Sequence, residues 1–115
     1  MAKIDQTKKP AGPQAEKLDK ERIKSILGQV PEDKVFWCHE GCIFRDLQEL
    51  QEAFEDMSDE TFAYHANSDK KDFSRWVEDV IGDAKLAKDL EAVSTHRQAA
   101  KIVEQRLALL SDLAR

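Results

Sequence analysis

The sequence has few of the residues that mark several specialised classes of protein. It holds two cysteines, three prolines and four glycines in 115 residues. Two cysteines exclude a small fold held together by several disulfides. The scarcity of proline and glycine excludes collagen-like and low-complexity chains. We therefore expect a domain that is stabilised by a hydrophobic core.

Long apolar runs are also absent. No run approaches the ~18 residues that a membrane helix needs, and residues 1–9 lack the apolar stretch of a secretory signal. We therefore expect no contact with a membrane. Together with the small number of cysteines, these features predict a cytoplasmic protein.

The chain has no surplus of positive charge, because its formal net charge is -5. Residues 1–24 hold seven Lys/Arg against four Asp/Glu, and the remainder holds eleven against nineteen. An acidic body disfavours nucleic-acid binding, because phosphate contacts need clustered Lys/Arg. We interpret residues 1–13 as a disordered basic arm and residues 14–115 as one globular domain. A nucleic-acid-associated protein that uses this arm is the second alternative.

Apolar residues make up 41% of the chain and charged residues 36%, which is typical of helices with solvated outer faces. Apolar spacing predicts a first helix over 14–27, ended by Gly28. A capping box of Asp46 and Glu49 begins the next helical stretch. The next helix is predicted to begin with a cap at Ser58 and to end at Asn67 in a left-handed conformation. A cap at Asp69 or Asp72 then begins a helix that ends at Gly82, and Asp83 begins another. Ser94 is the predicted cap of a last helix of about 18 residues.

Residues 35–38 and 42–44 differ from the rest, because they are β-branched, aromatic and sulfur-containing. Gly41 between them can adopt the positive φ of a type I turn followed by a bulge, which predicts a β-hairpin. Two strands alone are marginally stable, so the hairpin must pack on helices. The predicted fold class is α+β and mostly helical, with an N-terminal helix, one hairpin and four to five short helices.

The hairpin also holds the chain's two thiols. Cys38, His39 and Cys42, with His65, are candidate zinc ligands, but three residues separate the cysteines and no second pair exists. Thiols that face each other across a hairpin could instead form a disulfide. We favour ordinary free cysteines, at least one of them buried, and expect no metal or other cofactor. A metal-binding or thiol-redox regulator built on Cys38, His39 and Cys42 is the first alternative.

Three polar residues, His65, Asn67 and Asp72, lie at the joint between two predicted helices. They could form a polar pocket in which His65 accepts a proton or binds a ligand. We favour local capping and hydrogen bonding, since a cap contributes about 1 kcal/mol. His96 is predicted to face solvent. Seven aromatic residues are assigned to the core because of their periodicity: Phe36, Trp37, Phe44, Phe54, Phe62, Phe73 and Trp76.

The last helix carries an apolar stripe that is wider than one packing face requires. Ile102, Leu109 and Leu113 are the predicted contact edge, for a protein partner or for a second copy of the chain. The sequence holds no Gly-rich phosphate loop, nucleophile elbow or identifiable Ser/His/Asp set. We therefore predict a non-catalytic protein-interaction or regulatory module and not an enzyme.

Several motifs occur in a fixed order along residues 35–107: a hairpin ending in Gly41, Met57-Ser58-Asp59-Glu60-Thr61-Phe62, Tyr64-His65-Ala66-Asn67, and Asp72-Phe73-x-x-Trp76. This order resembles a family of small prokaryotic domains of unknown function, seen in archaea and bacteria. The resemblance implies a compact shared fold and no particular activity. The cysteine pair and residues 1–13 lie outside the pattern.

Overall fold

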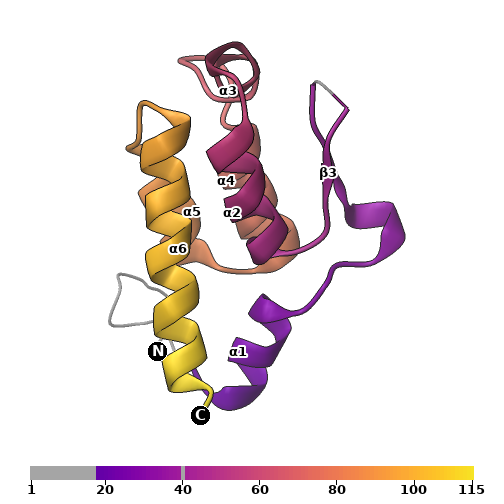
Figure 1. Ribbon diagram of the computed structural model, residues 1–115. Coiled ribbons are helices and arrows are strands. Elements are labelled where there is room, and N and C mark those ends of the chain that lie inside the picture. Colours follow the sequence, from indigo (N-terminus) through magenta and orange to yellow (C-terminus); the bar gives the residue numbers. More distant parts are fainter. Residues whose placement is uncertain (1–17, 40) are drawn as a thin grey trace, which may run out of the picture.

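The computed structural model describes residues 18–39 and 41–115. Helices make up 66% of the structure, with six helices and one two-stranded antiparallel hairpin (Figure 1). The predicted α+β, mostly helical class is therefore confirmed. The predicted arm over 1–13 and the start of the predicted first helix lie outside the described residues.

The first described helix is α1 (Lys20–Leu27). The Asp19 carboxylate accepts a hydrogen bond from the Arg22 N–H at 2.8 Å, which caps the helix at its N-terminus. Ile23 and Ile26 are buried, and the helix ends at Gly28 as predicted. A 3-10 turn, η2 (Glu32–Lys34), then leads into the hairpin.

The hairpin consists of β2 (Phe36–Trp37) and β3 (Ile43–Phe44), with Phe36 opposite Phe44. Gly41 has a φ of +92° and donates its N–H to the Cys38 carbonyl, so the predicted glycine turn is confirmed. Because side chains alternate along a strand, Phe36 is buried while Trp37 is 69% exposed. The assignment of Trp37 to the core was therefore wrong.

Two helices follow the hairpin, α2 (Leu47–Asp56) and α3 (Asp59–His65). Asp46 caps α2 at the Glu49 N–H, as predicted, but the Glu49 carboxylate accepts from the Arg45 N–H one residue before the cap. Ser58 caps α3 through the Thr61 N–H. Both predicted helix starts are therefore confirmed.

Helix α4 (Asp72–Trp76) continues without a break into the π-helical segment η3 (Val77–Ile81). The residue before α4 is Lys71, which makes no side-chain cap, so the predicted caps at Asp69 and Asp72 were wrong. Asp72 is instead the first helical residue, and its carboxylate binds His65. Gly82 ends η3 with a φ of +91°, as predicted.

The last two helices are α5 (Ala84–Glu91) and α6 (His96–Leu113). Asp83 caps α5 through the Leu86 N–H, as predicted. The cap of α6 is Thr95, which forms a capping box with Gln98, so the predicted cap at Ser94 was one residue early. The length of α6, 18 residues, agrees with the prediction.

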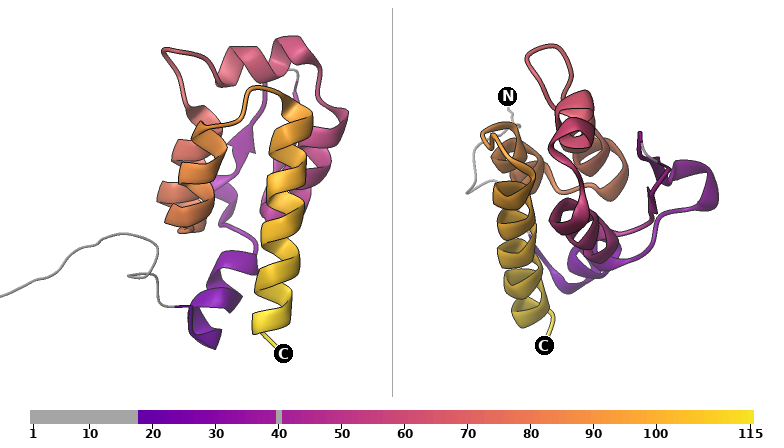
Figure 2. Two further views of the ribbon diagram at one scale, coloured as in Figure 1. Left: turned by 90° about the vertical axis from the view of Figure 1, so that its left-hand side faces the viewer. Right: turned by 45° about the horizontal axis from the view of Figure 1, so that its top comes forward.

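In space, α6 lies beside α2, and α1 packs across the same end of both helices (Figures 1 and 2). Helices α4 and α5 lie behind this pair, and α3 crosses the opposite end. The hairpin packs on the edge of this arrangement. None of the described helices has both the length and the apolar character needed to cross a membrane.

Aromatic rings fill the centre of the core. The Phe36 ring stacks on Phe44 with 4.7 Å between centroids, and it also packs against Phe73 and Trp76. Trp76 donates its indole N–H to the Lys34 carbonyl at 2.8 Å, which ties the 3-10 turn to α4. The core therefore holds the inner side of the hairpin against the helices and leaves its outer side in solvent.

Candidate functional site

The His65 side chain connects the end of α3 to both the hairpin and α4. Its Nε2 accepts the His39 backbone N–H at 2.9 Å, and its Nδ1 lies 2.9 Å from the Asp72 Oδ2. A backbone N–H can only donate, so Nδ1 carries the ring proton and donates it to Asp72. The ring is 6% exposed. With both nitrogens engaged, His65 has no lone pair directed at a substrate or an ion.

The residues around this link form a closed ring of contacts on the surface. Asp72 Oδ2 lies 3.4 Å from the Lys70 Nζ, which lies 4.1 Å from the centre of the Tyr64 ring. Tyr64 in turn stacks on the His39 ring at 4.0 Å between centroids. His39 then closes the ring through its backbone N–H to His65. This arrangement fixes the tip of the hairpin against the joint between α3 and α4.

Asn67 shapes the joint itself. Its amide Nδ2 donates to the Ala63 carbonyl at 2.8 Å, and its Oδ1 accepts the N–H groups of Asp69 and Lys70. The C-cap residue is Ala66 in an extended conformation, so Asn67 terminates α3 through its side chain one residue after the cap. The sequence-predicted joint of His65, Asn67 and Asp72 is thus assembled, with Asn67 on the turn and the other two in direct contact.

Cys38 and Cys42 form a disulfide, with 4.9 Å between their Cα atoms. The prediction of free cysteines was therefore wrong, for a geometric reason. The Cys38 N–H donates to the Cys42 carbonyl, so the two residues are paired across the hairpin and their side chains lie on the same side. The two sulfurs bind each other in this structure. Among residues 18–39 and 41–115, no three His, Cys, Asp or Glu side chains are grouped to hold a metal ion.

The disulfide lines a cavity of about 260 Å³ together with residues of α2, with Met57 just after that helix and with Thr61 of α3. Thr61 Oγ1 is buried and has no hydrogen-bond partner among the described residues. Neither His65 nor Asp72 lines this cavity. The polar joint and the sulfurs therefore do not converge on one hollow.

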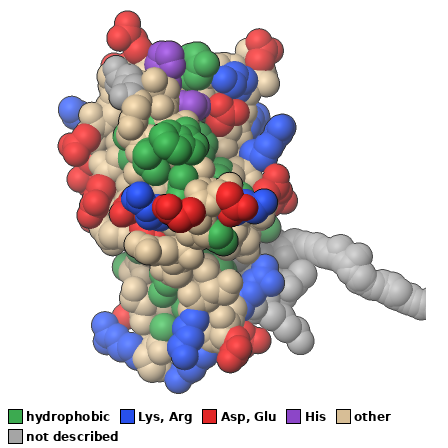
Figure 3. Space-filling model, turned by 90° about the vertical axis from the view of Figure 1, so that its right-hand side faces the viewer, with side chains coloured by type: hydrophobic (Ala, Val, Ile, Leu, Met, Phe, Trp, Pro, Cys, Tyr) green, Lys and Arg blue, Asp and Glu red, His purple; other side chains and the backbone are tan. Residues whose placement is uncertain are grey.

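The face of the molecule on the hairpin side carries a hydrophobic patch surrounded by charged side chains, with histidines beside it (Figure 3). Trp37, on this hairpin, is the most exposed of the large hydrophobic side chains described, and Tyr64 is 48% exposed. The predicted contact edge on α6 is less exposed than Trp37. Leu109 and Leu113 are 46% and 44% exposed, whereas Ile102 is half-buried against the core.

Sequence reasoning missed a buried ion pair. Arg106 on α6 donates from Nε and Nη2 to the two carboxylate oxygens of Asp83, at 2.8 and 2.9 Å. Asp83 is 1% exposed and Arg106 is 8% exposed. Arg106 has the same helical spacing as the buried residues Val103 and Leu110, and this position within an apolar stripe was the available signal.

His96 also belongs to that buried stripe, and the prediction that it faces solvent was wrong. It is 9% exposed, and its Nδ1 lies 2.7 Å from the Phe54 carbonyl. Its Nε2 lies 3.2 Å from Asp59. His96 therefore joins the start of α6 to α2 and α3.

Comparisons of the chain with family models, with curated proteins and with solved structures found no match. The function is therefore inferred from three features of this mostly helical α+β protein: a disulfide-closed hairpin, an engaged histidine and an exposed aromatic face.

Proposed function

We propose that this protein is a non-catalytic interaction module that binds a protein partner through the outer side of its hairpin. The observation that carries the proposal is the 69% exposure of Trp37 on a segment that is otherwise firmly held. Tryptophan is enriched among the residues that dominate binding energy at protein interfaces. We call Trp37, His39 and Tyr64 the hairpin face.

The hairpin face is held in one conformation from two sides. Within the turn the Gly41 N–H donates to the Cys38 carbonyl, and at its edge His65 binds the His39 backbone. A surface that is already ordered loses little side-chain and backbone entropy when it binds, which favours affinity. This rigidity supports a binding role for the exposed indole.

A non-catalytic role is supported by the engagement of the buried polar groups. His65 and His96 each have both ring nitrogens in contact with neighbouring groups, and Asp83 binds Arg106 through both oxygens. Catalysis by a side chain needs a group within reach of a substrate atom. These groups instead connect helices to one another.

Three further expectations belong to the same proposal. Leu109 and Leu113, with Ile102 at their margin, form a second contact edge through which two copies of the chain associate. The protein acts in the cytoplasm, as its composition predicts. It belongs to the small prokaryotic domain family that its motifs resemble.

The test uses the full chain with a photocrosslinking amino acid, p-benzoylphenylalanine, at position 34 beside the hairpin. Position 104, on the exposed side of α6, is the matched control site. We expect a discrete crosslinked protein from position 34 in native cells and none from position 104. The Trp37→Ser change should lower its yield at least about tenfold, the effect of about 1.4 kcal/mol. Equal yields from both sites, or an undiminished yield in Trp37→Ser, would contradict the proposal.

A thiol-redox regulator is the second candidate, and the disulfide itself favours it. In the cytoplasm thiols are kept reduced, so the bond between Cys38 and Cys42 would be broken there and would form only when conditions become more oxidising. The Cys42 residue is exposed, whereas Cys38 is 6% exposed. One thiolate of a dithiol could therefore attack the Cys42 sulfur, form a mixed disulfide and release the Cys38 thiolate. The second thiolate of the dithiol then attacks the mixed disulfide, releases the Cys42 thiolate and closes the dithiol's own disulfide.

This candidate is tested by equilibrating the protein with defined ratios of reduced and oxidised dithiothreitol. Alkylation and mass spectrometry then count the free thiols. A regulator should convert reversibly between both forms, with a change in the chemical shift of the His39 amide. A bond that stays oxidised at cytoplasmic potentials, or an unchanged His39 amide, would exclude this role.

A further inference from the structure

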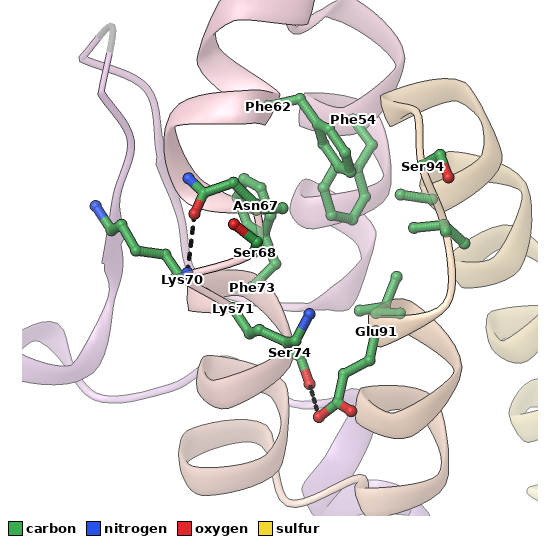
Figure 4. Close-up of a pocket in the computed structure, with 14 residues that line it drawn as sticks. Phe54, Phe62, Asn67, Ser68, Lys70, Lys71, Phe73, Ser74, Glu91 and Ser94 are labelled. Atoms are coloured by element: carbon green, nitrogen blue, oxygen red, sulfur yellow. Dashed lines mark hydrogen bonds between the residues drawn. The ribbon is translucent and has the colours of Figure 1, made fainter.

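A cavity of about 270 Å³ lies on the side of the molecule where the joint before α4 meets the loop between α5 and α6. Its inner wall is formed by three phenylalanines, Phe54, Phe62 and Phe73, and its outer wall by polar and charged residues (Figure 4). The volume is slightly below the range of about 300–1,000 Å³ typical of ligand pockets. Its occupant must therefore be small.

The inner wall offers an apolar, preformed surface. Phe54 and Phe73 pack edge to face with 4.9 Å between centroids, and Phe62 stacks on Phe73 at 5.8 Å. All three rings are at most 6% exposed, so their positions are fixed by the core. Only the small exposed parts of Phe62 and Phe73 can contact a group that enters the cavity, because Phe54 is fully buried behind them.

Three charged residues line the outer wall, Lys70, Lys71 and Glu91 (Figure 4). Lys71 makes no ion pair within the described part of the chain, whereas the Lys70 ammonium is engaged with Asp72 and Tyr64. The carboxylate of Glu91 is positioned by the buried Ser74 hydroxyl, which lies 3.2 Å from Oε2. That hydroxyl also lies 2.7 Å from the Ala87 carbonyl, and its single proton cannot satisfy both acceptors.

We propose that this cavity binds a free hydrophobic α-amino acid. The side chain lies against the phenylalanine wall, the carboxylate faces the Lys71 ammonium and the α-ammonium faces the Glu91 carboxylate. Charge complementarity selects this class of ligand. A simple fatty acid would bring its carboxylate close to Glu91, and an amine would bring its ammonium close to Lys71, so each would meet one repulsive group. This site lies apart from the hairpin face and does not depend on its role.

The experiment compares three probes that share one aliphatic group. L-leucine carries both charges, 4-methylpentanoate lacks the ammonium, and 3-methylbutylamine lacks the carboxylate. Binding to the full-length protein is measured by titration calorimetry, and amide chemical shifts locate the site. We expect leucine to bind about two- to fivefold more tightly than either analogue, because Lys71 and Glu91 are both exposed and contacts to exposed charges are screened by water. The amides of Phe73 and Val93 should shift.

Four variants sharpen the test. Lys71→Gln and Glu91→Gln should each weaken leucine binding about two- to fivefold and bring its affinity to that of one analogue. The matched controls Lys88→Gln and Glu104→Gln change exposed residues that do not line the cavity, and they should leave affinity unchanged. Thermal unfolding confirms that each variant is folded.

Three outcomes would overturn the proposal. One is leucine binding no tighter than the analogues. Another is unchanged affinity in both charge variants. The third is the absence of binding by leucine, isoleucine, valine, methionine and phenylalanine alike.

Discussion

Two buried polar links hold this molecule together, and their surroundings differ. The pair of Asp83 and Arg106 joins the start of α5 to the middle of α6, and it is almost completely sealed from solvent. The link through His65 joins the hairpin to α3 and α4 at the surface. Its partner Asp72 has a third of its side chain exposed, and Tyr64 and His39 lie in solvent beside it.

The difference indicates two physical roles. A sealed ion pair adds little net stability compared with apolar packing, but it becomes very costly when one partner is lost. It therefore fixes the relative position of two helices. The His65 link consists of hydrogen bonds close to solvent, and less free energy is lost when they are broken than when the buried ion pair is broken. It positions a surface segment, and this is the segment that we propose binds a partner.

The first prediction tests the sealed link, where we expect the largest effect. Arg106→Met removes the cation and leaves the Asp83 carboxylate buried without a counter-charge. The free energy of unfolding should fall by about 3–5 kcal/mol. Urea denaturation followed by far-ultraviolet circular dichroism measures the change.

The matched control is Arg97→Met, an exposed arginine on the same helix, which should change stability by less than about 0.5 kcal/mol. Adding Asp83→Asn to Arg106→Met removes the buried charge but keeps a good helix cap. This double variant should recover at least half of the lost stability. No recovery would mean that Arg106 acts through packing and not through charge.

The second prediction tests the link through His65 at the surface. His65→Ala leaves the His39 N–H without its acceptor and removes a ring that packs against Phe36 and Phe73. The free energy of unfolding should fall by about 2–3 kcal/mol. Hydrogen exchange of the His39 amide should accelerate more than that of amides in α6.

The control for this comparison is His39→Ala, which keeps the backbone N–H and loses only the exposed ring. We expect it to cost less than about 1 kcal/mol, because it removes one stacking contact at the surface. If His39→Ala destabilises as much as His65→Ala, the side-chain stack and not the backbone link holds the hairpin.

The two regions also differ in how far the sequence predicts them. The helices were predictable because their signals are local: Ser58, Asp83 and Gly82 each act on residues within one turn. The hairpin was predictable for the same reason, from Gly41 and two β-prone runs. Caps were misplaced where two polar residues compete within a few positions, as with Ser94 and Thr95.

The contacts of the candidate site were less predictable because they join distant segments. His65 meets the hairpin 26 residues earlier in the chain, and Arg106 meets Asp83 across 23 residues. Spacing along one helix shows that a polar residue lies on the buried face, but not which partner it meets there. The exposure of Trp37 depends on which side of the hairpin packs on the helices, and alternation alone leaves both choices open.

The third prediction concerns the disulfide, which closes a short loop and should have a smaller effect. Crosslinking about five residues reduces the entropy of the unfolded chain by an amount worth about 2 kcal/mol. The double variant with Cys38→Ser and Cys42→Ser should lose about that much stability in non-reducing buffer. The wild-type protein measured in excess dithiothreitol should show the same loss, and the variant should not respond to the reductant. A reductant effect on the variant would show that the loss has another cause.

The last prediction has the smallest effect on stability and bears most directly on function. Trp37→Ser should change the free energy of unfolding by less than about 0.5 kcal/mol, because the indole is mostly solvated and the core ring in β2 is Phe36. Trp76→Phe is the contrasting variant, since it removes the buried indole N–H that the Lys34 carbonyl accepts, and it should cost about 1–3 kcal/mol. Urea unfolding of both variants separates the two tryptophans. A destabilisation by Trp37→Ser as large as that of Trp76→Phe would mean that the exposed ring stabilises the fold. The exposure of Trp37 would then no longer indicate that the hairpin face binds a partner.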